Sequence, residues 1–448
     1  MPHAVLRALY AGSIAVIVLY GGFVAPPALA VDIRSVTSPK GIVAWLVHDP
    51  AVPVISMSFA FDAGAAHDPA GKEGRAQMTA SLLDEGAGEL DSQAFQRRLE
   101  DIAMSLRFSA TRDSFRGTIR TLSANRDAAF AMLALALTRP RFDAEPVERI
   151  RAQTLSALDD DEEEPQTIAS RTWFNAVFPG HPYGRPVSGT PQSVKTVAVA
   201  DLRQFVRDYL TRDRLKIGVV GDIAPDELAR RLDEIFGGLP ATGSSARVPD
   251  IKPAAAGRVI VVERAIPQSV VTFGQTAVGR KDPDWYAAYI MNRVLGGGGF
   301  SSRLTEEIRE KRGLAYSVYS YLIPLDHAPL IVGGVATANE RVAESLRLIR
   351  GEWRRMAEHG LTEKELDVAK TYINGSFPLR FDSSRRIADV LVSIQMDNLG
   401  IDYIDRRPRL INAVTLADIR RVARRILRAD RLTVVVVGKP VGIISNVP

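Results

Sequence analysis

Two polar residues one helical turn apart mark the stretch of residues 71–86, GKEGRAQMTASLLDEG. Its apolar residues predict a helix, and on that helix Gln77 and Ser81 share one side. The same spacing lets an H-x-x-E-H motif hold zinc between two imidazoles, with the glutamate as general base. Here an amide and a hydroxyl, both weak zinc ligands, stand at the ligand positions, and Ala80 cannot accept a proton at the base position. The stretch therefore predicts a core helix that holds no metal.

A second pair of chemically capable residues lies in the run 304–318, which contains Arg309 and Tyr316 on either side of Gly313. We expect residues 306–311 to be helical and to end near the glycine, after which the chain leaves as a strand. The two side chains would then converge on one point, where a permanent cation and a hydroxyl donor could stabilise an oxyanion. The alternative is that Arg309 is a surface charge in an E-x-x-R helix pattern.

Just before this run, Gly296, Gly297, Gly298 and Gly299 precede Phe300. A phosphate-binding loop is disfavoured, because no G-K-[ST] follows and the preceding element is predicted to be a helix rather than a strand. Two interpretations remain. The segment is either a flexible turn or a substrate-contacting loop, since glycines let the backbone approach an extended peptide closely.

Three further features carry charge or histidine. The acidic run 159–164, DDDEEE, is typical of a solvated loop or helix end rather than a metal site. His181, in F-P-G-H-P-Y-G-R-P, has no second histidine nearby, which favours a structural loop over a metal ligand. A basic cluster is predicted to form one solvated helix face, in preference to a lipid or protein contact. That cluster comprises Arg420, Arg421, Arg424, Arg425 and Arg428.

The composition is that of a soluble globular protein: 448 residues, 46% hydrophobic and 24% charged, with a modest formal charge of +5 that does not indicate nucleic acid. The chain contains no cysteine, which excludes thiol catalysis and thiolate metal sites. Residues 1–30 predict a cleaved secretory signal peptide, because Arg7 precedes an apolar run over 8–24 and residues 27–30 end in the A-L-A pattern of a cleavage site. The competing interpretation is an uncleaved anchor, since the run is close to the lower limit for a membrane span. We expect no stable membrane insertion after cleavage.

An internal repeat predicts the architecture. Residues 201–222 and 418–439 match at a constant offset, and each copy reads as a helix followed by an apolar strand that ends in glycine. The intervening residues 237–257 are rich in Gly, Ala, Pro and Ser and predict a linker. We therefore expect two homologous α+β lobes, residues 31–236 and 258–448. Within the first lobe, apolar spacing predicts a helix from Ser92 through Leu106 and a strand pair over 110–122.

Several motifs resemble the pitrilysin/insulinase family of inverted-motif zinc metallopeptidases. Gly74, Ala76 and Gly86 stand in register with the family's zinc-binding helix, and segments 178–186 and 304–318 are similar to its other conserved runs. The resemblance implies two lobes, each a mostly antiparallel sheet with packed helices, facing each other across a cleft. It also implies a glutamate zinc ligand on a later helix. Here that helix reads RAQTLSAL, with no acid in register.

In this family, degenerate chains often pair with catalytic ones. The resemblance therefore implies a non-catalytic subunit of an exported heterodimeric zinc metalloprotease, most simply in a bacterial periplasm, that needs no cofactor of its own. A catalytic H-x-x-E-H partner would hold the zinc, while Arg309 and Tyr316 assist its site and residues 296–300 contact the peptide. The alternative is a stand-alone peptide-binding or scaffold protein. Metal-independent hydrolysis is disfavoured, because no Ser/His/Asp arrangement has a recognisable local signature.

Overall fold

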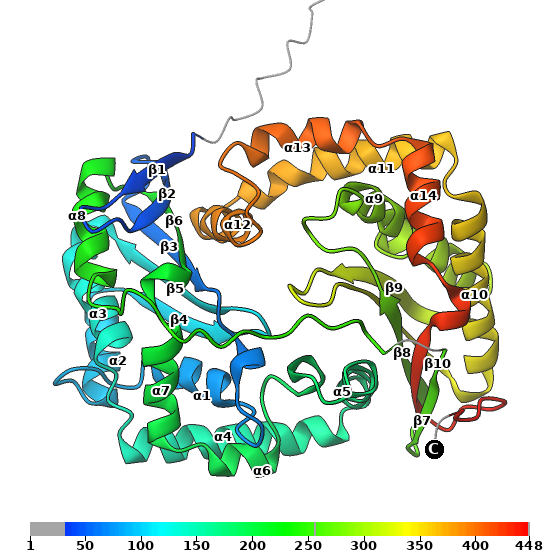
Figure 1. Cartoon of the computed structure of the whole chain (residues 1–448), viewed down its shortest axis with the longest axis horizontal. Helices are drawn as coiled ribbons and strands as arrows, with labels where there is room; N and C mark the ends of the chain where they lie inside the picture. The colour runs from blue at the N-terminus through cyan, green and yellow to red at the C-terminus, as the bar shows by residue number, and fades with distance from the viewer. Residues whose placement is uncertain (1–31, 255–256, 447–448) are drawn as a thin grey trace, which may run out of the picture. The chain divides into compact units, whose positions relative to one another are not determined.

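The computed structural model describes residues 32–254 and 257–446. The predicted signal peptide, residues 1–30, lies outside the described residues. Among those described, no helix is long and apolar enough to cross a membrane. The described chain is built on two β-sheets, each covered by helices (Figure 1).

The first sheet has six strands in the order β1-β2-β6-β3-β5-β4. They are β1 (Arg34–Thr37), β2 (Val43–His48), β3 (Val54–Phe61), β4 (Ser105–Ala110), β5 (Phe115–Leu122) and β6 (Leu215–Gly221). The second sheet has five strands in the order β7-β11-β8-β10-β9. They are β7 (Val259–Glu263), β8 (Gln268–Thr276), β9 (Ala315–Ile323), β10 (Leu330–Ala338) and β11 (Thr433–Gly438).

The repeat predicted from the sequence is confirmed by the topology. Strand β6 of the first copy lies parallel to β2 and antiparallel to β3. Strand β11 of the second copy likewise lies parallel to β7 and antiparallel to β8. Once β1 is set aside, the two strand orders correspond one to one. The predicted fold class, two α+β lobes with mostly antiparallel sheets, is therefore confirmed.

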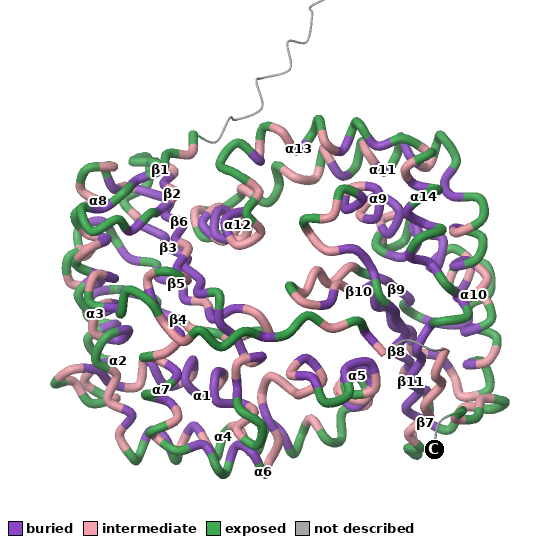
Figure 2. Tube along the Cα trace, viewed as in Figure 1, coloured by how far each residue is buried: buried purple, intermediate pink, exposed green. Residues whose placement is uncertain are grey.

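Helices cover one face of each sheet and bury a separate hydrophobic core there. In the first lobe these are α1 (Arg75–Leu82), α2 (Ser92–Asp101), α3 (Arg126–Thr138), α4 (Ala144–Glu163), α6 (Pro191–Thr196), α7 (Val199–Tyr209) and α8 (Pro225–Phe236). In the second lobe they are α9 (Trp285–Leu295), α10 (Val342–His359), α11 (Glu363–Ser376), α13 (Tyr403–Asn412) and α14 (Leu416–Ile426). Figure 2 shows the central strands buried and the outer helix faces exposed.

Two boundaries predicted from apolar spacing are wrong. The strand pair predicted over 110–122 begins earlier, because its first strand is β4 and only β5 lies within that range. Helix α2 ends at Asp101 instead of continuing through Leu106, and Ala103 takes a left-handed conformation with φ 49°. The side chain of Leu106 belongs to β4, where it lies opposite Ile119. Leu106 continues the helical spacing of apolar residues, but one apolar residue at that distance fits a strand equally well. The local pattern alone therefore did not show that the helix ends and the chain reverses before Leu106. The helix is capped by Asp91, whose carboxylate accepts from the backbone N–H of Ala94.

The second face of each sheet is covered by a helix from the other half of the sequence. Helix α5 (Pro165–Val177) packs on β8 and β11, with the indole N–H of Trp173 donating to the carbonyl of Thr433 at 3.0 Å. Gly274 of β8 admits this helix, since a Cβ there would lie 2.7 Å from the Trp173 ring. The alternating side chains of β11 therefore enter two cores, Val434 and Val436 on one face, Val435 and Val437 on the other.

The reciprocal helix is α12 (Ser384–Met396), which packs on β3 and β6 of the first sheet. Gln395 donates to the carbonyl of Ile217 at 2.8 Å. Gly218 of β6 again permits the approach, because a Cβ there would lie 2.6 Å from the carbonyl oxygen of Ala388. The two halves of the chain thus each supply a helix to the other half's sheet.

Candidate functional site

The degenerate motif lies on α1, which is a core helix as predicted. Ala80 is buried, together with Ala76, Met78 and Leu82, in the core of the first lobe. Gln77 and Ser81 are half-buried on the other side of the helix. The helix packs against α7, α4 and β4.

The side chains around α1 do not fit a zinc ion. Gln77, Ala80 and Ser81 supply no imidazole or carboxylate, and the nearby Glu85 already accepts from Arg149 at 2.6 Å. On α4, the helix on which the sequence resemblance implies a glutamate ligand, the side chain of Leu158 is buried among apolar groups. The described residues contain no cluster of three or more His, Cys, Asp or Glu side chains suited to a metal. We therefore derive no chemical step through a metal in this chain.

What anchors α1 is a buried ion pair that sequence reasoning missed. Arg75, only 2% exposed, lies 3.4 Å from Asp68 and donates to the carbonyl of His67 at 2.8 Å. Its guanidinium also lies 5.3 Å from the Phe205 ring centroid and 5.6 Å from that of Tyr209. The available signal was an arginine inside an otherwise apolar helix start, which is a costly position unless the charge is paired.

Asp68 also closes the N-terminal end of α1. Its carboxylate accepts from the backbone N–H groups of Gly74 and Ala76, both at 3.1 Å. Gly74 has φ 94°, a left-handed conformation that favours glycine, and it opens the helix as the sequence predicts. Burial outweighs these contacts and the ion pair, and it raises the pKa of Asp68 to about 7.

His67 gives this corner of the fold a testable pH dependence. Burial, reinforced by Arg214 and Arg75, lowers its pKa from 6.5 to about 4. The unfolded state therefore binds more protons at His67 than the folded state does. The contribution of His67 to the free energy of unfolding is fully present above pH 6.5 and is lost as the pH falls toward 4. We expect this group to reduce the free energy of unfolding by about 2 kcal/mol between pH 7 and pH 4.5.

The measurement compares urea unfolding of the parent chain and of His67→Gln at both pH values. The comparison with the variant is needed because Asp68 titrates in the same pH window. Its raised pKa means that the folded state gains a proton on acidification, which increases the free energy of unfolding and opposes the effect of His67. The variant should lose about 2 kcal/mol less than the parent on acidification. Equal losses in the two proteins would contradict the assignment to His67.

The other candidate residues are positioned by a π-helix in the second lobe. Residues Thr305–Glu310 form this element, in which the N–H of Lys311 donates to the carbonyl of Glu306 at 3.0 Å. Gly313, at φ 58°, then turns the chain into β9. The sequence predicts a helix and a turn here, and the structure differs only in the wider helix type. Short π-helices are rare in proteins overall, and those that do occur are often found at functional sites.

This turn brings Arg309 and Tyr316 together, as the spacing predicts. The guanidinium carbon of Arg309 lies 5.1 Å from the Tyr316 ring centroid and 4.4 Å from that of Phe300. Both rings are largely exposed, Phe300 at 72% and Tyr316 at 85%. The carboxylate paired with Arg309 is that of Glu310, at 3.6 Å. A cation held over aromatic faces keeps the N–H groups at its edge free to donate.

The glycine run presents Phe300, and it is fixed on β9 rather than loose. The N–H of Ser320 donates to the carbonyl of Gly296 at 3.1 Å, and a Cβ on Gly296 would lie 2.3 Å from the Ser320 hydroxyl. Gly297 and Gly298 are similarly close to Asn292 and Arg293, whereas Gly299 faces open space at φ 57°. The first three glycines are therefore required by close packing.

Strand β9 itself is the last strand of its sheet. It pairs with β10 on one side, and within the described residues its other backbone edge has no strand partner. Tyr319 and Tyr321 project from it and stack with centroids 6.0 Å apart, continuing the aromatic surface that Tyr316 begins. Part of that edge is already bonded within the chain, because the N–H of Ser320 donates to Gly296 and its carbonyl accepts from Asn292 at 3.1 Å. The strand therefore offers its exposed aromatic side chains rather than a free backbone edge.

The two sets of candidate residues belong to different cores. Met78 and Ala80 of α1 are buried in the first lobe, whereas Ile308 and Ala315, which flank Arg309 and Tyr316, are buried in the second. The structure thus joins Phe300, Arg309 and Tyr316 into one site and leaves the degenerate motif apart from it.

The remaining predictions are also settled by the geometry. The ring of His181 accepts from the N–H of Tyr183 at 3.1 Å and contacts the carbonyl of Pro249 at 2.9 Å, which confirms a structural role. The acidic run ends α4 and is largely exposed, and Glu164 caps α5, as predicted for a solvated helix end.

Comparison with known families agrees with this class of fold, a two-lobed metallopeptidase fold without its metal ligands. The family model described as "Insulinase (Peptidase family M16)" matches residues 43–191, and the model described as "Peptidase M16 inactive domain" matches residues 196–373. The chain belongs to peptidase family M16, as the sequence resemblance implies.

Individual relatives are consistent with this membership. The non-peptidase homolog YmxG of Helicobacter pylori is 29% identical over 73% of this chain and 76% of its own length. An uncharacterized zinc protease of Mycobacterium bovis is 28% identical over 90% and 92%. The crystal structure of a peptidase M16 inactive domain from Pseudomonas fluorescens superposes with a TM-score of 0.85 at 26% identity, covering 93% of this chain and all of that one.

Proposed function

We propose that this chain is the non-catalytic subunit of an exported heterodimeric zinc metalloprotease. In this proposal a second M16 chain with an intact H-x-x-E-H motif holds the zinc, and this chain binds the peptide and supplies Arg309 and Tyr316. Export, toward a bacterial periplasm, is proposed from the signal-peptide pattern of residues 1–30. The relative named a non-peptidase homolog and the neighbour titled an inactive domain support the non-catalytic role.

The observation that carries the proposal is the exposed stack of Phe300, Arg309 and Tyr316. A purely structural chain has no need to hold a half-exposed guanidinium over two exposed rings at 4.4 and 5.1 Å. Such a guanidinium is preorganised, because the rings fix its plane before a substrate arrives. It can therefore donate to a developing oxyanion without reorganising, with the Tyr316 hydroxyl as a second donor.

Peptide binding is proposed along the aromatic surface of β9. Tyr319 and Tyr321 are both partly exposed and offer this surface for the peptide's side chains. The site would then lie on the same strand as Tyr316. A stand-alone peptide-binding or scaffold protein is the second candidate, and the same surface would serve it.

The first test concerns metal and activity. Because Gln77, Ala80 and Ser81 replace the zinc site, the purified mature chain is expected to hold no stoichiometric zinc and to cleave no peptide. Elemental analysis measures the metal, and cleavage of a peptide mixture is assayed for the chain alone, for its co-purifying M16 partner alone and for the two together. The proposal expects the mixture to be far more active than either chain.

Two outcomes would contradict the proposal. About one tightly held zinc per chain would restore a catalytic role to this subunit. Equal activity of the partner with and without this chain would favour the stand-alone scaffold instead.

A further inference from the structure

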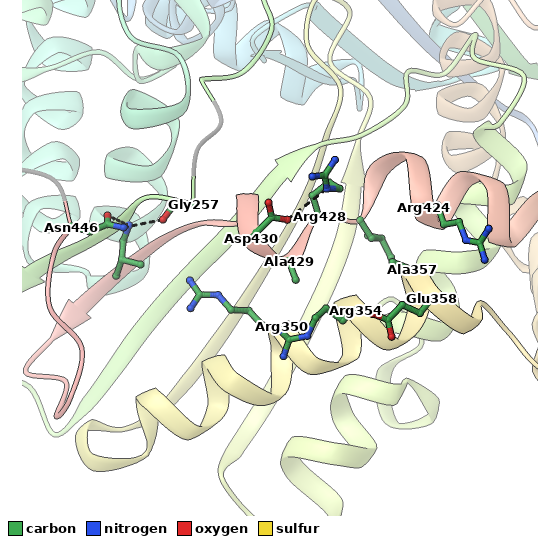
Figure 3. A pocket seen from close by; sticks show the side chains of 12 residues that line it. Gly257, Arg350, Arg354, Ala357, Glu358, Arg424, Arg428, Ala429, Asp430 and Asn446 are labelled. Atoms are coloured by element: carbon green, nitrogen blue, oxygen red, sulfur yellow. Dashed lines mark hydrogen bonds and ion pairs between the residues drawn. The ribbon is translucent and has the colours of Figure 1, made fainter.

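A groove of about 740 Å³ lies between α10 and the segment that follows α14, at the β7 edge of the second sheet. Four arginines line it. Arg350 and Arg354 come from α10, and Arg424 and Arg428 come from the end of α14 and the residues beyond it (Figure 3). Lysine does not occur among the lining residues.

Among residues 32–254 and 257–446, most of this positive charge has no paired carboxylate. Across the described residues, the guanidinium groups of Arg350, Arg354 and Arg424 have no carboxylate within ion-pair distance, while Arg428 lies 3.6 Å from Asp430. The groove's other acid, Glu358, instead lies 3.8 Å from His359. The four guanidiniums and two carboxylates leave a net charge of about +2.

The neighbouring arginines of the same helix behave differently. Arg421 pairs with Asp284 at 2.6 Å, and Arg425 pairs with Asp282 at 2.7 Å and with Asp284 at 2.9 Å. All five arginines of the basic cluster are exposed, as the sequence predicts for a solvated face. Their counter-charges differ: Arg421 and Arg425 are neutralised by acids at the start of α9, whereas Arg424 and Arg428 line the groove.

Two of the groove's arginines repel each other. Arg350 and Arg354 are four residues apart on α10, and like charges at this spacing on a helix are destabilising. Arg428 lies beyond Ile426, where α14 ends, and the extended segment that follows brings it to the groove. A bound anion would offset the repulsion between Arg350 and Arg354.

The groove is distinct from the Phe300–Arg309–Tyr316 site. Val259 of β7 lines the groove, whereas Tyr316 lies on β9, and these strands are the two opposite edges of the five-stranded sheet. Four strand spacings separate them, or about 19 Å. A ligand in the groove would therefore not contact the candidate site.

We propose that this groove binds a small organic molecule that carries a phosphate group. Guanidinium groups pair with phosphate through two parallel hydrogen bonds, which explains why the groove contains arginine and no lysine. A phosphate group carries a charge of about −1.5 to −2, which matches the net charge of the groove. The buried side chains of Leu427 and Ala429 form an apolar floor for the organic part.

The volume of the groove lies in the range of small-molecule sites, about 300–1,000 Å³. The phosphate could belong to a soluble metabolite or to a lipid headgroup, and the two sources share this chemistry.

The test measures binding of phenyl phosphate to the full-length mature chain by calorimetry at about 0.15 M salt. We expect saturable binding with a submillimolar Kd, and none for phenol, which has the ring without the charge. Arg354→Gln and Arg424→Gln should each weaken binding about tenfold, the usual effect of one charged hydrogen bond. The matched control is Arg355→Gln, since Arg355 is exposed on the same helix, lies outside the groove and pairs with Glu352 at 3.3 Å.

A second arm separates the two sources of phosphate. The parent chain and Arg354→Gln are tested for binding to phosphatidic acid vesicles at concentrations where phenyl phosphate also binds. Vesicle binding by the parent chain that is lost in Arg354→Gln would assign the site to a lipid headgroup and support the proposal. Three results would overturn it: no saturable binding of phenyl phosphate below about 10 mM, an equal loss in Arg355→Gln, or tighter binding of a tetraglutamate peptide than of phenyl phosphate. Because no proteolytic partner is needed, the result does not depend on the proposed protease function.

Discussion

If this chain pairs with a catalytic M16 subunit as proposed, Arg309→Ala is expected to lower the turnover of that pair by about a hundred- to thousandfold, while folding and pairing persist. Loss of one preorganised oxyanion donor typically costs about 3–4 kcal/mol of transition-state stabilisation. Within the part of the chain that the structure describes, the guanidinium is partnered by Glu310 at 3.6 Å and by two ring faces, so its removal leaves no buried group there unsatisfied. Substrate affinity should change less than turnover, because the interaction is made mainly in the transition state.

The measurement is steady-state cleavage of a peptide by this chain reconstituted with a catalytic M16 partner. Tyr316→Phe is the informative companion variant, since it keeps the ring beneath Arg309 and removes only the hydroxyl. Arg312→Ala is the matched control: that arginine lies three residues on and pairs with Glu307 at 2.6 Å. Its loss should cost less than about 1 kcal/mol. Parental rates for both Arg309→Ala and Tyr316→Phe would make this chain a lid or scaffold without a part in the chemistry.

The second large effect is on stability. Arg75→Met should lower the free energy of unfolding by about 3–5 kcal/mol at pH 8, where Asp68 is ionised in the folded state. The substitution leaves the carboxylate, itself only 3% exposed, without the cation at 3.4 Å that compensates its burial. It also removes the donor to the His67 carbonyl. Urea unfolding followed by circular dichroism measures the change.

Two comparisons show whether the ion pair is the cause. Arg386 is an exposed arginine of α12 that pairs with Asp382, a residue just before that helix. Arg386→Met should lower the free energy of unfolding by less than about 1 kcal/mol. Adding Asp68→Asn to Arg75→Met removes the uncompensated charge, so the double variant should be more stable than Arg75→Met alone. A double variant that is less stable than the single one would show that Asp68 acts mainly as the cap of α1.

Much of the fold could be predicted from local sequence because its signals are local. The repeat of an amphipathic helix and an apolar strand predicts α7 with β6 and α14 with β11, and these pairs occupy equivalent places in the two sheets. The loss of the zinc site needs no structure at all, since a ligand's chemistry is a property of the side chain that is present. The meeting of Arg309 and Tyr316 follows from a short spacing across one glycine turn.

Other features were decided only by tertiary structure, because they join residues far apart in the sequence. Helical periodicity shows that α5 and α12 each have an apolar face, but it cannot show that each covers the sheet built by the other half of the chain. The partner of Arg75, the ring of Phe300 over Arg309 and the acids that neutralise Arg421 and Arg425 are likewise distant or non-periodic neighbours. Residue types determine what each group can do, whereas the energy of a buried charge or an unpaired arginine depends on which neighbours the fold places beside it.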